Sequence, residues 1–213
     1  FFFKQKTAYE IKECDWSSDV CSSDLLQRDH ASALLAAADR DRSTYGYTPV
    51  PDDLVAMEAY IDGLLADAAR DAVVPFAQVR TGDGAPVGCT RYLNVQWWAG
   101  RALPAEVEIG GTWLATDAQR TPLNTEAKLL LMRHAFEEWD VFRVAICTDA
   151  LNERSRRAIE RLGATFEGIL RSHRPNTGFL TRPGLARDTA AYSVIATEWP
   201  QVRARLESFL YDR

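Results

Sequence analysis

The sequence has no long apolar run and no block of basic residues. A membrane-spanning helix needs about 18 consecutive apolar residues, and no stretch reaches that length. The formal net charge is −5, and no basic patch stands out as it would in a protein that binds nucleic acid. We therefore expect neither a membrane nor a nucleic acid as partner.

Cysteine is also scarce, with four in 213 residues. Cys14 and Cys21 fall near the N-terminus, and Cys89 and Cys147 each fall in an expected strand. Such scattered thiols form neither a disulfide framework nor a metal-ligand spacing. We predict that Cys89 and Cys147 are small buried side chains, that the protein binds no metal, and that it is cytoplasmic.

Lysine is rare outside the N-terminal segment. Lys4, Lys6 and Lys12 lie in a stretch that contains no arginine, and Lys128 is the only later lysine. The sequences FFFKQKTAYEI and CDWSSDVCSSDL resemble in-frame translations of sequencing adapters, and their basic residues follow the apolar ones, unlike a signal peptide. We interpret residues 1–25 as an artefactual, non-native extension, either disordered or a poor surrogate edge strand, and predict that the native first strand is missing.

The remaining chain is large enough to bury one full core without disulfides or metal. Apolar residues recur with helical spacing in some segments and alternate in others, where we expect strands. The expected helices are 30–40, 51–70, 124–139, 152–162 and 200–211, and the expected strands are 73–80, 86–96, 106–115, 142–149, 165–174 and 190–197. This order predicts a single α+β domain over residues 26–213 with a mixed sheet flanked by helices.

The strand 106–115 carries two glutamates on one face. Alternation places Glu106 and Glu108 opposite an apolar face, and Gly110 with Gly111 suggests a bulge or a close approach. A bulge would leave backbone N–H groups free to receive a thioester carbonyl. Two interpretations stay open: both glutamates are solvated, or Glu108 takes a proton from an amine, directly or through water.

The loop 116–123 precedes a helix that is apolar on two sides. Asn124 can cap that helix, and the free N–H groups and positive dipole end at a helix start suit a pyrophosphate. Helix starts are common, so this signal alone is weak. His134, inside the helix, is interpreted as a packed or half-exposed residue and not a catalyst.

The helix 152–162 places Ser155, Ala158, Ile159 and Leu162 on one inward face. Ser155 either bonds a backbone carbonyl of the preceding turn or points at a bound group, with Asn152 beside it. Arg154, Arg157 and Arg161 of this helix are interpreted as a solvated face.

These segments resemble the GNAT superfamily of acetyltransferases, within it the branch that acetylates N-terminal amines of ribosomal proteins. The resemblance covers Leu26–Trp199 and rests on VEIGGTWL, QRTPLNTEAKLLLMRHAFE, ICTDALNERSRRAIERLGATFEGILR and RDTAAYSVIATEW. It implies a GNAT-like, mostly antiparallel sheet whose central strands splay apart, and acetyl-CoA as the co-substrate.

The resemblance also implies which residues hold the coenzyme. The family's pyrophosphate loop follows Gln/Arg-x-x-Gly-x-Gly/Ala, and Pro122 departs from it because proline has no N–H to donate. Proline is tolerated beside a first helical turn, so we expect weaker affinity and not a lost site. The implied coenzyme contacts are Ile109, Gly110, Gln119, Arg120, Thr121, Leu123, Asn124, Thr125, Asn152 and Ser155.

The implied reaction is direct acetyl transfer to a primary amine, either a protein N-terminus or a small amine. Glu108 would remove the proton and Ser155 would protonate the departing thiolate. Trp97 and Trp98 are interpreted as cover for a sheet edge or the rim of a pocket, and the predicted acceptor contacts are Trp97, Trp98, Glu106 and Arg182. The alternative is a coenzyme-binding regulatory module with weak or no catalysis, and the protein is expected to be a monomer or homodimer.

The segment between the last two strands is long and rich in proline, glycine and arginine. Loops of this length are usually functional or mobile. Its arginines, Arg174, Arg182 and Arg187, suggest an acceptor that carries a carboxylate.

Overall fold

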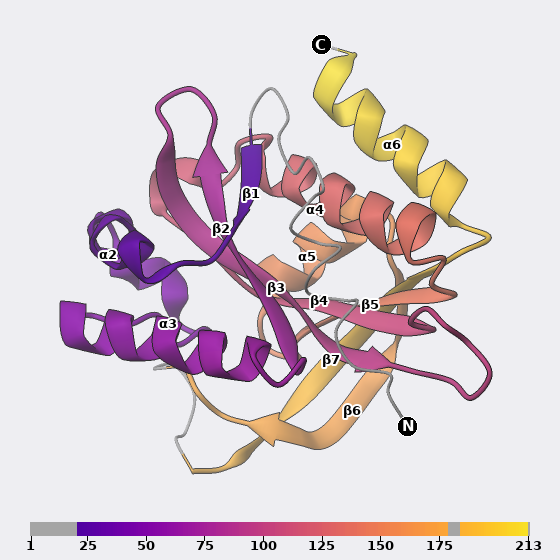
Figure 1. Cartoon of the computed structure of the whole chain (residues 1–213), viewed down its shortest axis with the longest axis horizontal. Coiled ribbons are helices and arrows are strands. Elements are labelled where there is room, and N and C mark those ends of the chain that lie inside the picture. The colour runs from indigo at the N-terminus through magenta and orange to yellow at the C-terminus, as the bar shows by residue number, and fades with distance from the viewer. Residues whose placement is uncertain (1–20, 179–183, 213) are drawn as a thin grey trace.

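The computed structural model describes residues 21–178 and 184–212. Seven strands form one sheet in the order β1-β2-β3-β4-β5-β7-β6, with helices against both faces (Figure 1). The strands are β1 (Cys21–Leu25), β2 (Val73–Arg80), β3 (Ala85–Gln96), β4 (Glu106–Leu114), β5 (Arg143–Asp149), β6 (Thr165–Pro175) and β7 (Ala186–Ile195). The helices are α2 (Ala31–Ala38), α3 (Leu54–Ala68), α4 (Leu123–Arg133), α5 (Glu153–Leu162) and α6 (Trp199–Tyr211).

All neighbouring strands are antiparallel except β4 and β5, which run parallel. The sheet is therefore mixed and mostly antiparallel, as the sequence predicted. Every expected helix and strand is present. Among the strands, the largest change in an end is at β7, which begins at Ala186 and not at residue 190, so the connection after β6 is shorter than expected.

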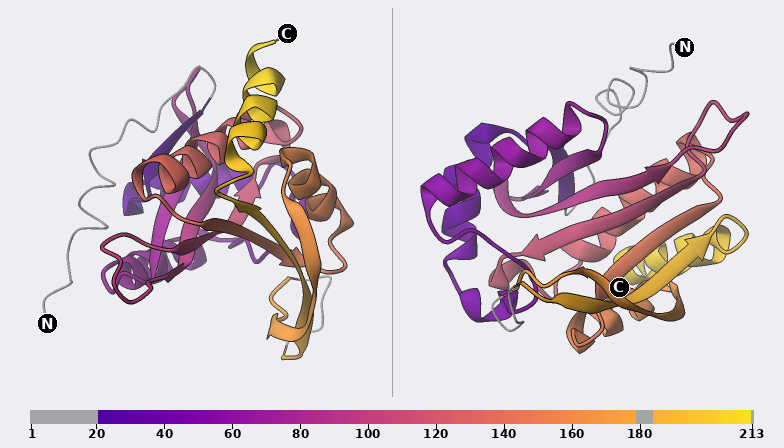
Figure 2. Two further views of the ribbon diagram at one scale, coloured as in Figure 1. Left: turned by 90° about the vertical axis from the view of Figure 1, so that its right-hand side faces the viewer. Right: turned by 90° about the horizontal axis from the view of Figure 1, so that it is seen from below.

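The two faces of the sheet are covered by different helices. α4, α5 and α6 share one core cluster with β3, β4, β5 and β7, in which Tyr92, Ile109 and Trp139 are fully or almost fully buried. α2 and α3 pack on the other face over β2, β3 and β4. Figure 2 shows α2 and α3 beside the N-terminal strands, away from α5 and α6. Neither α2 nor α3 therefore covers the face of β5 and β7 that lies opposite α5.

The helix expected over 124–139 is interrupted. α4 ends at Arg133, and His134–Glu138 form a turn of π-helix, η4. His134 is 6% exposed, and its ring lies 4.9 Å from that of Trp139. Its burial selects the packed alternative, and the same burial lowers the pKa of His134 to about 4.

The end of the N-terminal segment forms an edge strand of the sheet. Cys21–Leu25 pair with β2 in unbroken antiparallel register, from Cys21 opposite Arg80 to Leu25 opposite Phe76. Cys21 and Ser23 are fully buried, so residues 21–25 form an edge strand of the sheet and the alternative of disorder does not hold for them. The domain boundary at residue 26 stays a prediction. The non-native origin of residues 1–25 stays a prediction, and residues 1–20 lie outside the described structure.

The central parallel strands separate soon after they meet. β4 and β5 pair at three positions, of which Glu108 opposite Ala145 is the last. Beyond it, β4 continues to Leu114 and β5 to Asp149 without further pairing between these two strands. The splay predicted from the resemblance is present, and its open end lies at the carboxyl ends of both strands.

Candidate active site

Two helices begin at the open end of the splay. α4 follows β4 and α5 follows β5 along the chain, so the positive ends of both helices lie near the gap. A side chain joins the two helices: Arg161 Nη2, in the last turn of α5, donates to Thr125 Oγ1, in the first turn of α4, at 2.7 Å. This arrangement collects free backbone N–H groups and guanidinium charge in one place, which suits a pyrophosphate.

The loop before α4 supplies donors despite its proline. Pro122 is the N-cap residue, with φ −58°, a position where its missing N–H removes no helical hydrogen bond. The N–H of Leu123 already donates to Thr121 Oγ1 at 3.4 Å, whereas Asn124 and Thr125 occupy first-turn positions without helical acceptors. Arg120 has φ +61°.

The side chain of Gln119 stabilises the loop. Its Nε2 donates to Thr44 Oγ1 at 3.1 Å and to the Leu114 carbonyl at 2.9 Å, and its Oε1 accepts from Arg154 Nη1 at 3.3 Å. Arg154 also donates to the carbonyl of Thr44. Arg154 and Arg161 are exposed, as the sequence predicted, and each also donates a hydrogen bond to the loop before α4 or to its first turn. Coenzyme contact by Gln119 stays a prediction.

Asn152 and Ser155 lie together at the start of α5. Asn152 is the N-cap, and its Oδ1 accepts from the Ser155 N–H at 3.1 Å. The hydrogen bonds within the described part of the chain include none to the Ser155 hydroxyl, so the alternative in which it bonds a backbone carbonyl is not what the structure has. Ser155 Oγ, half-buried, is available to a bound group.

Glu108 is buried and not solvated. It is 4% exposed, and Arg174 binds both its oxygens, Nη1 to Oε1 at 2.9 Å and Nη2 to Oε2 at 2.6 Å. Asn94 Nδ2 adds a third donor to Oε2 at 2.8 Å. The solvated alternative for Glu108 is thus wrong, and its carboxylate is held in a single orientation.

An open pocket of about 690 Å³ lies over this carboxylate on the face opposite α4 and α5. A second ion-pair group lines it: Arg143 Nε donates to Glu106 Oε1 at 3.2 Å, and both Nη atoms of Arg143 donate to Glu167. The other lining residues are Asn94, Gln96, Trp98, Glu108, Ala145, Cys147, Gly168, Ile169, Leu170, His173, Arg174 and Ala191.

The sequence analysis predicted no role for Asn94 or Arg143. It assigned Arg174 to a carboxylate of the acceptor and not to Glu108. Asn94 has φ +52°, unusual for a residue other than glycine, but nothing in the sequence marks that conformation. The alternation that grouped Glu106 with Glu108 also runs through β5, where Arg143 and Ala145 lie opposite them. That alternation was the available signal for Arg143.

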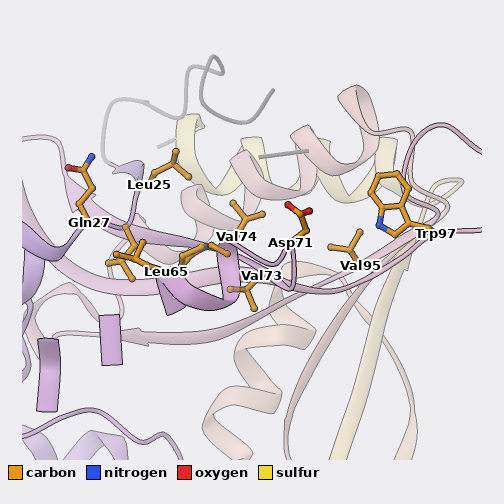
Figure 3. Close-up of a pocket in the computed structure, with 11 residues that line it drawn as sticks. Leu25, Gln27, Leu65, Asp71, Val73, Val74, Val95 and Trp97 are labelled. Atoms are coloured by element: carbon orange, nitrogen blue, oxygen red, sulfur yellow. The ribbon is translucent and has the colours of Figure 1, made fainter. Parts of the chain in front are cut away.

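The paired tryptophans serve two different pockets. Trp98 is 55% exposed, lines the pocket over Glu108 and lies with its ring 5.3 Å from that of Phe142. Trp97 lines a separate apolar pocket of about 320 Å³ together with Leu25, Val74 and Val95 (Figure 3). Of the two tryptophans, Trp98 lines the pocket over Glu108, and contact of either with an acceptor stays a prediction.

Cys147 lies in the Glu108 pocket but is not a nucleophile. Burial, with the negative charge of Glu108, raises the pKa of its thiol to about 11. The thiol stays protonated near neutral pH, and only a thiolate attacks a thioester effectively. A covalent acetyl-cysteine route therefore has no support here.

The remaining arginines predicted near the acceptor differ in their surroundings. Arg187 Nη1 lies 3.6 Å from Asp149 Oδ2, and Arg174 is paired with Glu108 as described. The predicted contact Arg182 lies outside the described residues. Within the described residues, no group of three or more His, Cys, Asp or Glu side chains could hold a metal ion.

The chain belongs to the GNAT family of acetyltransferases. The family model described as an acetyltransferase (GNAT) domain matches residues 24–165, which is more than half of the chain. The splayed parallel strands and the helix starts beside them are arranged as the resemblance implied. The chain is an N-acetyltransferase, and enzymes of its family take the acetyl group from acetyl-CoA.

Solved structures support the same fold. An acetyltransferase of T. thermophilus, provisionally assigned, is 34% identical with a TM-score of 0.75, over 92% of this chain and 96% of that one. A GCN5-related N-acetyltransferase from Brucella melitensis is 26% identical with a TM-score of 0.77, over 92% and 84%. RimJ of Mycobacterium smegmatis, solved in complex with CoA-disulfide, is 22% identical with a TM-score of 0.71, over 89% and 88%, and shows the fold alone.

One curated relative is YdaF of Bacillus subtilis (strain 168), named provisionally as a ribosomal N-acetyltransferase. It is 36% identical over 89 residues, which are 42% of this chain and 45% of YdaF. The match thus spans less than half of that relative. Separately, none of the helices within residues 21–178 and 184–212 has the length and apolar character needed to cross a bilayer.

Proposed function

We propose that this chain transfers an acetyl group from acetyl-CoA directly to the primary amine of a protein N-terminus. The observation that carries the proposal is the splay between β4 and β5. Glu108 marks its last pair, helix starts lie at its open end, and the pocket over Glu108 lies on the opposite face from α4. A coenzyme held on the helix side and an amine in the pocket would meet through this gap.

The residues present fit acetyl-CoA, which would supply the activated acetyl thioester. The first-turn N–H groups of Asn124 and Thr125, with Arg120, would bind the pyrophosphate. The β4 backbone at Ile109 and Gly110, beyond the last pair with β5, would hold the thioester carbonyl and stabilise its negative charge. Asn152 would contact the pantetheine arm with its amide nitrogen.

The proton transfers are assigned to Glu108 and Ser155. Glu108 would accept the proton of the attacking amine, directly or through a water molecule. The hydroxyl of Ser155, with no hydrogen-bond partner within the described chain, would donate a proton to the sulfur of the departing thiolate. Names of relatives that refer to ribosomal N-acetylation favour a protein N-terminus over a free small amine.

The proposal is tested by following thiol release from acetyl-CoA with a panel of N-terminal peptides and small amines. Glu108→Gln is expected to lower kcat by about 10²-fold or more, the usual contribution of a general base, while coenzyme binding measured by calorimetry is retained. Glu207→Gln is the matched control, because Glu207 pairs with Arg203 on α6, away from the pocket.

Two results would contradict this assignment. Full activity of Glu108→Gln would remove Glu108 from the chemistry. Coenzyme binding by the wild type without transfer to any amine would favour a regulatory, coenzyme-binding module. One observation gives that second function some support: both oxygens of Glu108 already accept hydrogen bonds.

A further inference from the structure

Two backbone irregularities direct side chains onto the carboxylate of Glu108. Asn94 has φ +52° and Ser172 has φ +47°, in the left-handed region that residues other than glycine seldom occupy. Such conformations cost free energy and gather at active sites and ligand clamps. Each lies in a stretch where strand pairing is out of register, so both belong to β-bulges or related irregularities.

The irregularity in β3 turns Asn94 toward Glu108. Tyr92, two residues earlier, faces α4 and donates its hydroxyl to the Leu131 carbonyl. Strict alternation would send Asn94 to that same face. The register shift between Leu93 and Gln96 instead lets its amide reach Glu108 Oε2.

The irregularity in β6 carries Arg174 across the pocket. Leu170 pairs with Thr189 and Arg174 with Arg187, so β6 has more residues than β7 over this stretch. The Ser172 N–H leaves the ladder and donates to Asp188 Oδ1 at 2.8 Å. Although β5 and β7 separate β6 from β4 in the sheet, the guanidinium of Arg174 reaches Glu108 and spans the pocket.

The pocket therefore offers no uncompensated carboxylate to a lone cation. Glu108 is paired with Arg174, and both Glu106 and Glu167 share Arg143. An ammonium group that displaced Arg174 would leave this guanidinium, whose side chain is 26% exposed, without its counter-charge. Removing one partner of a buried ion pair is costly because the remaining charge is poorly solvated. An acceptor that also brings an anion avoids that cost.

We propose that Arg174 and Glu108 form a clamp that selects acceptors carrying a carboxylate close to the reacting amine. On binding, the acceptor replaces the ion pair between Arg174 and Glu108: its amine faces Glu108 and its carboxylate faces Arg174. The matching chemistry is a peptide with an acidic side chain at its first or second residue, or an α-amino acid. This inference rests on the proposed acetyl transfer and names its acceptor class. Arg174 is a specificity-determining residue and takes no part in the chemistry.

The test compares isosteric acceptors that differ in one charge. Thiol release from acetyl-CoA gives kcat/KM for peptides with Glu or Gln at the first position and with Asp or Asn at the second. An α-amino acid and its amide form the small-molecule arm. The wild type is expected to favour the acidic member by about tenfold or more, the scale of one hydrogen bond to a charged group. A larger preference in one arm identifies the source of the carboxylate.

The variants separate recognition from structural support. Arg174→Gln is expected to abolish the acid preference, and Arg174→Lys to keep part of it because the charge remains. Arg203→Gln is the matched control, since Arg203 is also an ion-paired arginine, bound to Glu137 and Glu207, but lies on α6. It should preserve the wild-type preference. Thermal unfolding and coenzyme binding establish that each variant is folded.

Each outcome of these experiments either supports or overturns the clamp. The clamp is overturned by equal rates for acidic and isosteric acceptors in the wild type, or by an Arg174→Gln variant that slows both equally and keeps their ratio. If Arg174→Gln does not fold, the wild-type ratios and Arg174→Lys still decide. Wild-type protein that binds coenzyme but acetylates nothing would refute the proposed function itself, whereas transfer without acid preference refutes only the clamp.

Discussion

At the scale of single residues, the active-site strand depends on one glycine. Gly111 has φ +58°, and a Cβ placed there would lie 2.6 Å from Arg91 Cζ and 2.7 Å from its Nε. Glycine alone adopts this conformation without a steric cost. Pairing with β3 shifts register over the same stretch, so Gly111 helps to form the irregularity that follows Ile109 and Gly110.

Gly111→Ala is expected to lower the free energy of unfolding by about 1–3 kcal/mol, the range for a strained backbone position. The side chain of Arg91 must also move aside. Gly82→Ala is the control, because a Cβ at Gly82 meets nothing within 4 Å. Chemical denaturation measures both variants, and equal stabilities would show that the strain at Gly111 is relieved elsewhere.

Local sequence signals predicted some residues of the site and not others. Consecutive glycines predicted the irregularity in β4, and helical spacing placed Ser155 beside Asn152. The state of Glu108 was not accessible, because its partners Asn94 and Arg174 come from other strands and reach it only through irregular backbone. A period of two predicts the face of a side chain only while the ladder is regular.

At the scale of elements, α5 has defined caps at both ends. Asn152 caps its N-terminus through Oδ1, and Gly163, with φ +101°, ends it in the left-handed conformation. Asparagine before a helix and glycine after it are common capping residues. The π turn after α4 was not visible in the sequence, because the apolar pattern continues through it and only the packing around His134 and Trp139 distinguishes it.

Asn152→Ala is expected to destabilise the protein by about 1 kcal/mol, the usual cost of losing an N-cap. Coenzyme affinity should fall as well if the start of α5 holds the pantetheine arm. Asn152→Asp keeps the cap acceptor and is the matched control for stability. Thermal unfolding with and without coenzyme measures both effects. Unchanged stability of Asn152→Ala would mean that neighbouring groups satisfy the Ser155 N–H.

At the scale of the whole molecule, the edge strand β1 shows what composition can and cannot predict. The unusual composition of residues 1–25 was clear, but composition carries no information on pairing. Alternation in Cys21–Leu25 happens to place Cys21 and Ser23 toward the interior, where both are fully buried, and β2 offers them an antiparallel partner. Pairing of this kind depends on backbone groups more than on side chains.

The interior between β1 and α4 contains the buried amine of Lys128. Lys128 is 4% exposed, and its Nζ donates to Thr90 Oγ1 at 3.0 Å and to Thr112 Oγ1 at 2.8 Å. It thereby joins α4 to β3 and β4. Burial lowers the pKa of Lys128 to about 7, far below the value of about 10.4 in an unfolded chain.

This shift makes stability depend on pH in a definite direction. Between about pH 7 and about pH 10.4 the unfolded chain binds the Lys128 proton and the folded chain does not, so stability rises with pH. Below about pH 7 both states are protonated, and the cost of the buried charge is constant. The contribution of Lys128 is therefore least favourable in acid and improves through mildly alkaline pH.

Lys128→Met is expected to stabilise the protein most at about pH 6, and by about 2 kcal/mol less at about pH 8.5, since each pH unit above 7 is worth about 1.4 kcal/mol. The hydroxyls of Thr90 and Thr112 lie 2.9 Å apart and can bond each other in the variant. Urea denaturation of variant and wild type at both pH values gives the difference, in which the titration of buried thiols cancels.

Arg203→Met, which removes a half-exposed cation, should show no such trend. A difference that stays constant with pH would mean that Lys128 keeps its proton in the folded protein and that the threonine hydroxyls compensate for its burial.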